Sequence, residues 1–117
     1  MHNFRKLEIW IEARRLVKEI YLLTLKFPSY EQFGLSSQLR RAAISIPSNI
    51  AEGSAKSSNK EFARFLEHST GSSFEAETQL TLAFDLNYIN NEEFDNIVSS
   101  IQKHQIKMCN FKNKLQQ

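Results

Sequence analysis

Apolar residues recur every three to four positions along most of the chain, which is the spacing of one face of an α-helix. This pattern predicts four helices over about residues 5–27, 36–53, 58–87 and 91–115. No segment alternates apolar and polar residues in the way of a half-buried strand. Four long helices joined by short loops favour an antiparallel up-down-up-down bundle. We therefore expect an all-α fold in which residues 1–117 form a single four-helix-bundle domain.

The second predicted helix contains the most unusual stretch, LRRAAISIPSNIAEG at residues 39–53. Its apolar residues fall on one side of a helix: Leu39, Ala43, Ile46 and Ile50. Proline has no backbone N–H and its ring collides with the preceding turn, so we expect Pro47 to interrupt this helix.

The third predicted helix leaves two alternatives open. Its inward seam consists of Phe62, Leu66, Ser69, Ser73, Ala76, Leu80 and Ala83. Gly71, Ser72 and Ser73 lower helix propensity near its middle. Either the helix is continuous and another backbone approaches closely there, or it breaks near Gly71.

Polar residues that could cap helices stand before three of the predicted helices. They are Ser36 or Ser37 for the second helix, Ser57, Ser58 or Asn59 for the third, and Asn90 or Asn91 for the fourth.

A row of polar residues runs beside the apolar face of the second helix. The row consists of Arg41, Ser45, Asn49 and Glu52. One interpretation is a structural network in which Arg41 pairs with a carboxylate such as Glu75, while Ser45 and Asn49 satisfy the carbonyl that Pro47 frees. The other makes Arg40 and Arg41 part of a ligand or nucleic-acid surface. Neighbouring residues point in different directions on a helix, so Arg40 cannot share the direction of Arg41.

Charge is unevenly distributed, although the net charge is only +2. Residues 1–64 contain 11 Lys/Arg against six Asp/Glu, residues 65–100 contain seven acidic and no basic residues, and residues 101–117 contain four Lys and no acid. A charge-segregated surface of this kind favours contacts with charged partners.

The sequence carries no pattern typical of a metal site, a cofactor site or a catalytic nucleophile. None of the three histidines follows a Glu by three residues, as a di-iron bundle requires, and no glycine-rich phosphate loop or GxSxG motif is present. The lone Cys109 cannot form an internal disulfide. We expect no cofactor and no enzymatic activity. With no signal peptide or membrane-spanning run, we also expect a cytoplasmic protein without membrane contact.

The sequence resembles the four-helix-bundle protein family found as open reading frames within the intervening sequences of bacterial 23S ribosomal RNA genes. The resemblance rests on LRRAAISIPSNIAEG at residues 39–53, EFARFL at 61–66 and GSSFEAETQL at 71–80. An early tryptophan matches Trp10, and the loop FP matches Phe27 and Pro28. The resemblance implies a four-helix bundle that assembles into a homopentamer. A related protein, the accessory variability protein of diversity-generating retroelements, has the same fold, binds nucleic acid through a basic surface and partners a reverse transcriptase.

Two functions remain open. In the first, a ring of subunits binds RNA or DNA backbone through basic residues, without sequence preference. The candidates are Arg14, Arg15, Lys18, Arg40, Lys56, Lys60 and Arg64. We do not expect specific readout of a single strand, because aromatic residues suitable for base stacking do not alternate with these charges. In the second, the oligomer is a protein-binding adaptor or scaffold, such as a reverse-transcriptase accessory. Its acidic block then faces basic regions of a neighbouring subunit, with no nucleic-acid contact.

Overall fold

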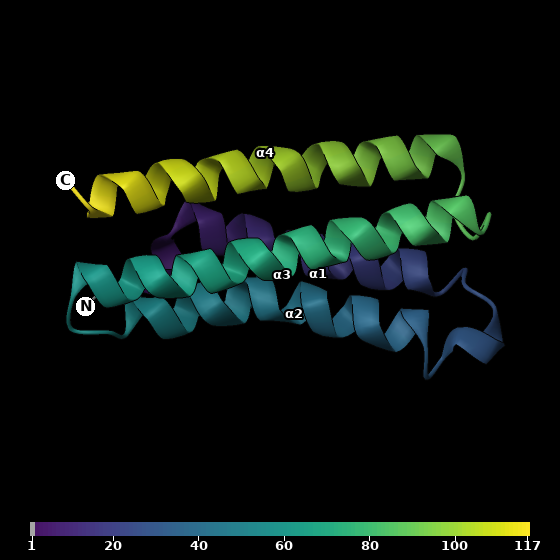
Figure 1. Cartoon of the computed structure of the whole chain (residues 1–117), viewed down its shortest axis with the longest axis horizontal. Helices are drawn as coiled ribbons and strands as arrows, with labels where there is room; N and C mark the ends of the chain where they lie inside the picture. The colour runs from purple at the N-terminus through teal and green to yellow at the C-terminus, as the bar shows by residue number, and fades with distance from the viewer. Residues whose placement is uncertain (1) are drawn as a thin grey trace.

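The computed structural model describes residues 2–117 and contains four long helices with no strand in that range. The helices are α1 (Glu8–Thr24), α2 (Leu35–Ser54), α3 (Asn59–Asp85) and α4 (Asn91–Leu115), as Figure 1 shows. Short 3-10 turns, η1 (Phe4–Lys6) and η2 (Ser29–Glu31), precede α1 and α2. The all-α expectation is confirmed.

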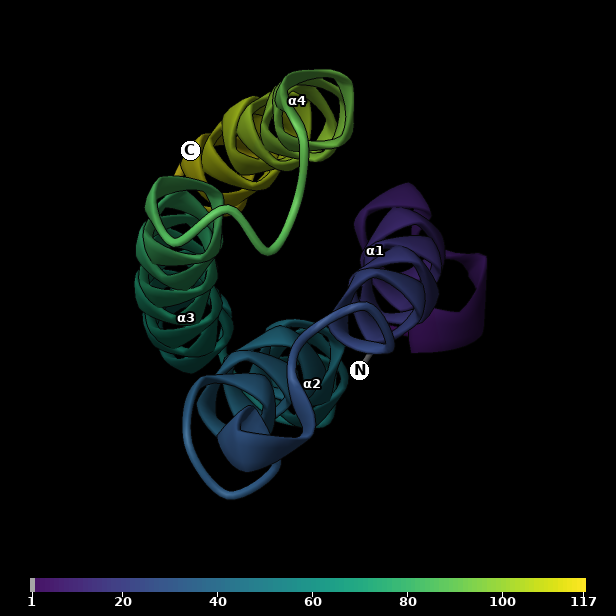
Figure 2. The ribbon, with the colours of Figure 1, turned by 90° about the vertical axis from the view of Figure 1, so that its right-hand side faces the viewer.

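The four helices form a ring in which each helix packs against two neighbours (Figure 2). α1 contacts α2 and α4, and α3 contacts the same two helices from the opposite corner. Successive helices run in opposite directions, and the molecule measures 44 × 24 × 20 Å. Among residues 2–117, no helix combines the length and the apolar character that crossing a lipid bilayer requires.

The predicted apolar faces form the core of the bundle. Leu39, Ala43, Ile46 and Ile50 are buried, as are all seven seam residues of α3. Burial of such side chains stabilises the folded chain by about 1.5–3 kcal/mol for each large apolar group. The hydrophobic periodicity therefore identified the faces that hold the four helices together.

The predicted interruption at Pro47 is not seen, because α2 continues through the proline to Ser54. A proline inside a helix removes one backbone hydrogen bond and crowds the carbonyl of the preceding turn, which costs about 3 kcal/mol. The neighbouring residues Ile46 and Ile50 are fully buried, so tertiary packing keeps the turn helical on both sides of the proline.

α3 is also continuous, which settles the alternative left open at Gly71. The close approach expected there is absent: a Cβ added at Gly71 would meet nothing within 4 Å. The close approach occurs at Gly53 instead. A Cβ there would lie 2.7 Å from Cβ of Phe65 and 2.9 Å from Cδ1 of Phe62, so α2 and α3 meet closely at their shared turn.

Two of the three expected N-caps are confirmed. Ser58 accepts a hydrogen bond from the backbone N–H of Glu61, and Asn90 forms a capping box with Glu93. Neither Ser36 nor Ser37 caps α2, which begins one residue earlier. The side chain of Glu31 reaches from η2 to accept the backbone N–H of Leu35 at 3.1 Å.

Candidate nucleic-acid interface

The charges of α1 are divided between two sides of the helix. Its acidic residues face α4, where Lys107 donates to Glu8 at 2.9 Å and to Glu12 at 2.6 Å. These hydrogen bonds raise the pKa of Lys107 and lower that of Glu8. Glu19 lines the groove between α1 and α4 as well. The side of α1 that faces α2 therefore carries basic and aromatic residues without acids.

Two arginines lie on aromatic rings along this α1–α2 seam. The guanidinium carbon of Arg14 is 5.7 Å from the ring centre of Trp10, and that of Arg40 is 4.6 Å from the ring centre of Tyr21. Nε of Arg40 also donates to the hydroxyl of Thr24 at 2.9 Å. The expectation that aromatic residues do not accompany these charges is thus wrong. The partners lie four residues apart or on different helices, so they are not adjacent in the sequence.

Beside Trp10 the seam opens into a mostly apolar groove of about 420 Å³. It is lined by Phe4, Trp10, Arg14, Val17, Ile44, Pro47, Ser48 and Ala51. The rings of Phe4 and Trp10 meet edge to face with their centres 5.0 Å apart. Arg14 is the only charged residue among those that line this groove.

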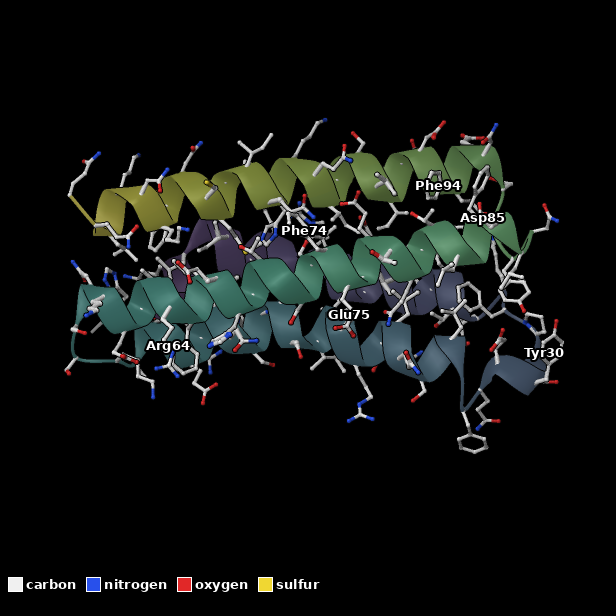
Figure 3. The ribbon with its side chains drawn as sticks, in the orientation of Figure 1. Tyr30, Arg64, Phe74, Glu75, Asp85 and Phe94 are labelled. Atoms are coloured by element: carbon white, nitrogen blue, oxygen red, sulfur yellow. The ribbon has the colours of Figure 1, made fainter. Side chains whose placement is uncertain are left out.

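A second basic cluster lies at the α2–α3 turn. The Lys56 Nζ is 4.9 Å from the ring centre of Phe65, and the Arg64 guanidinium carbon is 5.9 Å from the same ring. Arg64 also has a loose ion pair of 3.7 Å with Glu61, and both side chains are exposed to solvent. Lys60 is exposed beside them, and Figure 3 labels Arg64 at this end of the bundle.

The seven basic candidates do not share one patch. Arg14 and Arg40 lie on the α1–α2 seam, and Lys56, Lys60 and Arg64 lie at the turn where that seam ends. Lys18 is exposed on α1. Arg15 faces the other way, into the α1–α4 groove that also contains Glu12, Glu19 and Lys103.

The predicted polar row lies on the opposite side of α2, toward α3. Arg41, Ser45 and Glu75 line a shallow groove there, and Figure 3 labels Glu75 between the two helices. No ion pair joins Arg41 to Glu75 among residues 2–117, so the expected pairing is not formed, and both side chains are exposed.

The hydrogen bonds of the row are local to α2. Nδ2 of Asn49 donates to the carbonyl of Ser45 at 2.8 Å, whereas the carbonyl that Pro47 frees belongs to Ala43. Glu52 is exposed at the end of the row. Arg40 and Arg41 do point to different sides of α2, as their adjacent positions require.

Residues 2–117 contain one buried histidine and one cysteine. No group of three or more His, Cys, Asp or Glu side chains is placed to hold a metal ion among those residues. His104 is buried, with Nε2 2.7 Å from the carbonyl oxygen of Ile9, and burial lowers its pKa. Cys109 is exposed.

Comparison with known proteins supports a family assignment. Residues 5–110 match the family described as 23S rRNA-intervening sequence protein. A crystal structure of a protein of unknown function, from the S23 ribosomal protein family of Bacteroides thetaiotaomicron VPI-5482, is similar in fold with a TM-score of 0.79. The two chains are 20% identical, and the match covers 89% of this chain and 97% of that chain, a likeness that speaks for the fold alone. No curated protein matches the chain. Because the family match spans nearly the whole sequence, this chain belongs to the 23S rRNA-intervening sequence protein family.

Proposed function

We propose that this protein is a non-enzymatic nucleic-acid-binding protein that holds the backbone of RNA or DNA along the α1–α2 seam. The observation that carries this proposal is the pair Arg14 and Arg40, two guanidinium groups on one seam whose close contacts are aromatic rings and a hydroxyl group. Neither forms an ion pair with a carboxylate among residues 2–117. Both charges are therefore available to phosphate groups.

The seam leads to further cations. Lys56, Lys60 and Arg64 lie at the α2–α3 turn, beyond Ala51 at the end of the groove. The acidic residues of α1 face away from the seam, toward α4, where Lys107 forms ion pairs with Glu8 and Glu12. The absence of acidic residues on this side of α1 gives the α1–α2 seam a positive potential that attracts a polyanion.

Backbone binding predicts a steep dependence on salt, because each phosphate that a cation neutralises releases condensed counterions. The test measures fluorescence anisotropy of a labelled RNA and a labelled DNA duplex over a series of salt concentrations. Changing Arg14 and Arg40 together to Gln should weaken binding to both nucleic acids. It should also reduce the slope of log affinity against log salt concentration by about 2.

Arg14→Gln alone should lower the slope by about 1. Arg15→Gln is its matched control, because it removes one charge from the neighbouring position, which faces the α1–α4 groove. It should leave the affinity and the slope close to those of the unchanged protein. Equal losses in the Arg15 variant and the seam variants, or no binding at low salt, would refute the proposal.

We also propose that the chain assembles into a homo-oligomer, a pentamer as the family resemblance implies. Two outward faces support assembly. Leu22 on α1 is 55% exposed, Leu25 just after α1 is 72% exposed, and Phe74 on α3 is 57% exposed. Exposed apolar residues on two different faces suit a contact between unlike surfaces, and repetition of such a contact closes a ring.

The same faces support an alternative function as a protein-binding adaptor, with a reverse transcriptase or another protein as client. α3 also exposes the acidic residues Glu75 and Asp85, whereas α1 also exposes the basic residues Arg14 and Lys18. Figure 3 labels Phe74, Glu75 and Asp85 along α3. Charge-driven assembly predicts that light scattering will show dissociation at high salt. An oligomer that stays assembled at high salt and also binds nucleic acid would favour the nucleic-acid-binding function.

A further inference from the structure

We infer that the groove between α1 and α2 receives an unpaired nucleobase, so that the protein prefers single-stranded nucleic acid to a duplex. This inference rests on the proposed function and adds the part of the ligand that enters the groove. Trp10 is half-buried and lines the groove together with Phe4 and Arg14.

The walls of the groove suit a flat aromatic ring. Trp10 is held edge to face against Phe4, with the rings inclined by 65°. Val17 on α1, and Ile44 and Pro47 on α2, add apolar surface to the lining. The volume of about 420 Å³ lies in the range of small-molecule sites, so the groove can take a base.

The polar groups of the groove suit a base without selecting one. Ser48 supplies a hydroxyl group, which both donates and accepts hydrogen bonds, and the indole ring of Trp10 carries an N–H donor. Stacking against an aromatic side chain is available to every base, because every base has a π-face. The groove should therefore tolerate any sequence.

The positions of the two arginines favour a nucleotide strand as the occupant. Arg14 lies at the groove, and Arg40 lies further along the same seam above Tyr21. Trp10 and Tyr21 are 11 residues apart, which is about 16 Å along α1. A strand that places a base beside Trp10 can continue along the seam with its phosphates near both guanidinium groups. A duplex keeps its bases stacked inside and cannot enter the groove without unpairing.

An apolar segment of a protein would fit the apolar walls of the groove but would leave the charge of Arg14 without a partner. No acidic residue lines the groove, and Arg14 stands at its edge, so a protein occupant would have to bring a carboxylate of its own. A phosphate backbone brings negative charge with every nucleotide. For this reason the geometry points to a nucleic-acid strand.

The protein offers a direct test, because Trp10 is its only tryptophan. Tryptophan emission is recorded during titration with oligothymidylate, with an abasic oligomer of equal phosphate number, and with a duplex. We expect oligothymidylate to change the emission strongly, while the abasic oligomer and the duplex bind through their phosphates and leave it nearly unchanged.

Two substitutions test the groove, with binding of each labelled oligomer measured by fluorescence anisotropy. Trp10→Leu should weaken binding of oligothymidylate by about 5- to 150-fold, the range for loss of stacking of one base, and leave the abasic oligomer unaffected. Ala51→Leu keeps Trp10 and fills the groove, so it should produce the same selective loss. Ala55→Leu is the control, because Ala55 is exposed just beyond the end of α2.

The outcomes separate this inference from the function on which it rests. Equal binding of oligothymidylate and the abasic oligomer, with unchanged emission in both, would overturn base insertion and leave backbone binding intact. An emission change that follows protein concentration without nucleic acid would assign the groove to a second copy of the chain. Absence of binding to all three ligands would overturn both the inference and the proposed function.

Discussion

The hydroxyl group of Ser69 on α3 donates a hydrogen bond of 2.8 Å to the backbone carbonyl of Ile46 on α2. Ile46 directly precedes Pro47, and both Ser69 and Ile46 are fully buried. The hydroxyl oxygen of Ser69 also lies 3.3 Å from the sulfur of Met108 on α4. One small polar side chain thus connects the proline-containing turn of α2 to two other helices.

Removing this hydroxyl group should destabilise the bundle. Ser69→Ala deletes a buried interhelical hydrogen bond, for which we expect a loss of about 0.5–1.5 kcal/mol in the free energy of unfolding. Urea denaturation measures it, with Ser99→Ala as the control, because Ser99 is exposed on α4. Equal midpoints for the two variants would show that the bond adds nothing to stability.

The glycines of α2 and α3 should respond in opposite ways to the same substitution. At Gly53 an alanine methyl group would collide with Phe62 and Phe65, so Gly53→Ala should cost about 1–3 kcal/mol, as overpacking does. At Gly71 the methyl group meets open space within a continuous helix, and Gly71→Ala should stabilise by about 0.5–1 kcal/mol. Thermal unfolding of the two variants at equal protein concentration checks the sign of each change. Destabilisation by Gly71→Ala would reveal a packing partner at that face.

The periodicity of the sequence was sufficient for the helices but not for their local details. Inward faces depend on apolar spacing alone, so the sequence predicts that Leu39 and Leu66 lie in the core, where the structure has them. The continuity of α2 through Pro47 depends on packing from other helices, which no local pattern reports. The cap of α2 also comes from outside the helix, because Glu31 belongs to the preceding turn.

The candidate interface shows a similar limit. The sequence identified Arg14 and Arg40 as basic candidates, but their grouping on one seam, with Arg15 on another, depends on how α1 is rotated in the bundle. One signal was present in the sequence. Trp10, Arg14, Val17 and Tyr21 are spaced by four, three and four, which places them along one side of a helix.

Tyr88 at the η2 end of the bundle should ionise at unusually high pH. Its hydroxyl group lies 3.3 Å from that of Tyr30, which Figure 3 labels, and donates to Glu31 at 2.8 Å. These hydrogen bonds, with Tyr30 and then Glu31, raise the pKa of Tyr88 above its ordinary value of 10.0. Because the folded pKa is raised, the stabilising contribution of Tyr88 is present below pH 10 and is lost as the pH rises further.

Absorbance titration of the three tyrosines should therefore show one late step. Tyr88→Phe should remove that step, and Glu31→Gln should move it to lower pH because the carboxylate no longer opposes ionisation. The same late step in the Tyr88→Phe variant would assign it to another tyrosine.

His104 should make the stability of the bundle sensitive to mild acid. The side chain is 1% exposed, with Nε2 at 2.7 Å from the carbonyl oxygen of Ile9 and no hydrogen-bond partner for Nδ1 among residues 2–117. Burial lowers its pKa below the ordinary 6.5, and this effect exceeds the opposing influence of the Ile9 hydrogen bond and of Glu12. The nearby Lys107 lowers the pKa as well. The imidazole ring is accordingly neutral in the folded chain at neutral pH.

A lowered folded pKa means that the unfolded chain binds a proton first as the pH falls. The stability contribution of neutral His104 is then complete above about pH 6.5 and declines as the pH falls toward the folded pKa, with a slope of at most about 1.4 kcal/mol per pH unit. Urea denaturation at pH 7.5, 6.5 and 5.5 should show this decline, in a range above the ordinary carboxyl pKa of 4.5. His104→Gln does not titrate and should flatten the profile, whereas the exposed His68→Gln should preserve it. A profile that stays equally steep in the His104 variant would place the acid-sensitive group elsewhere in the bundle.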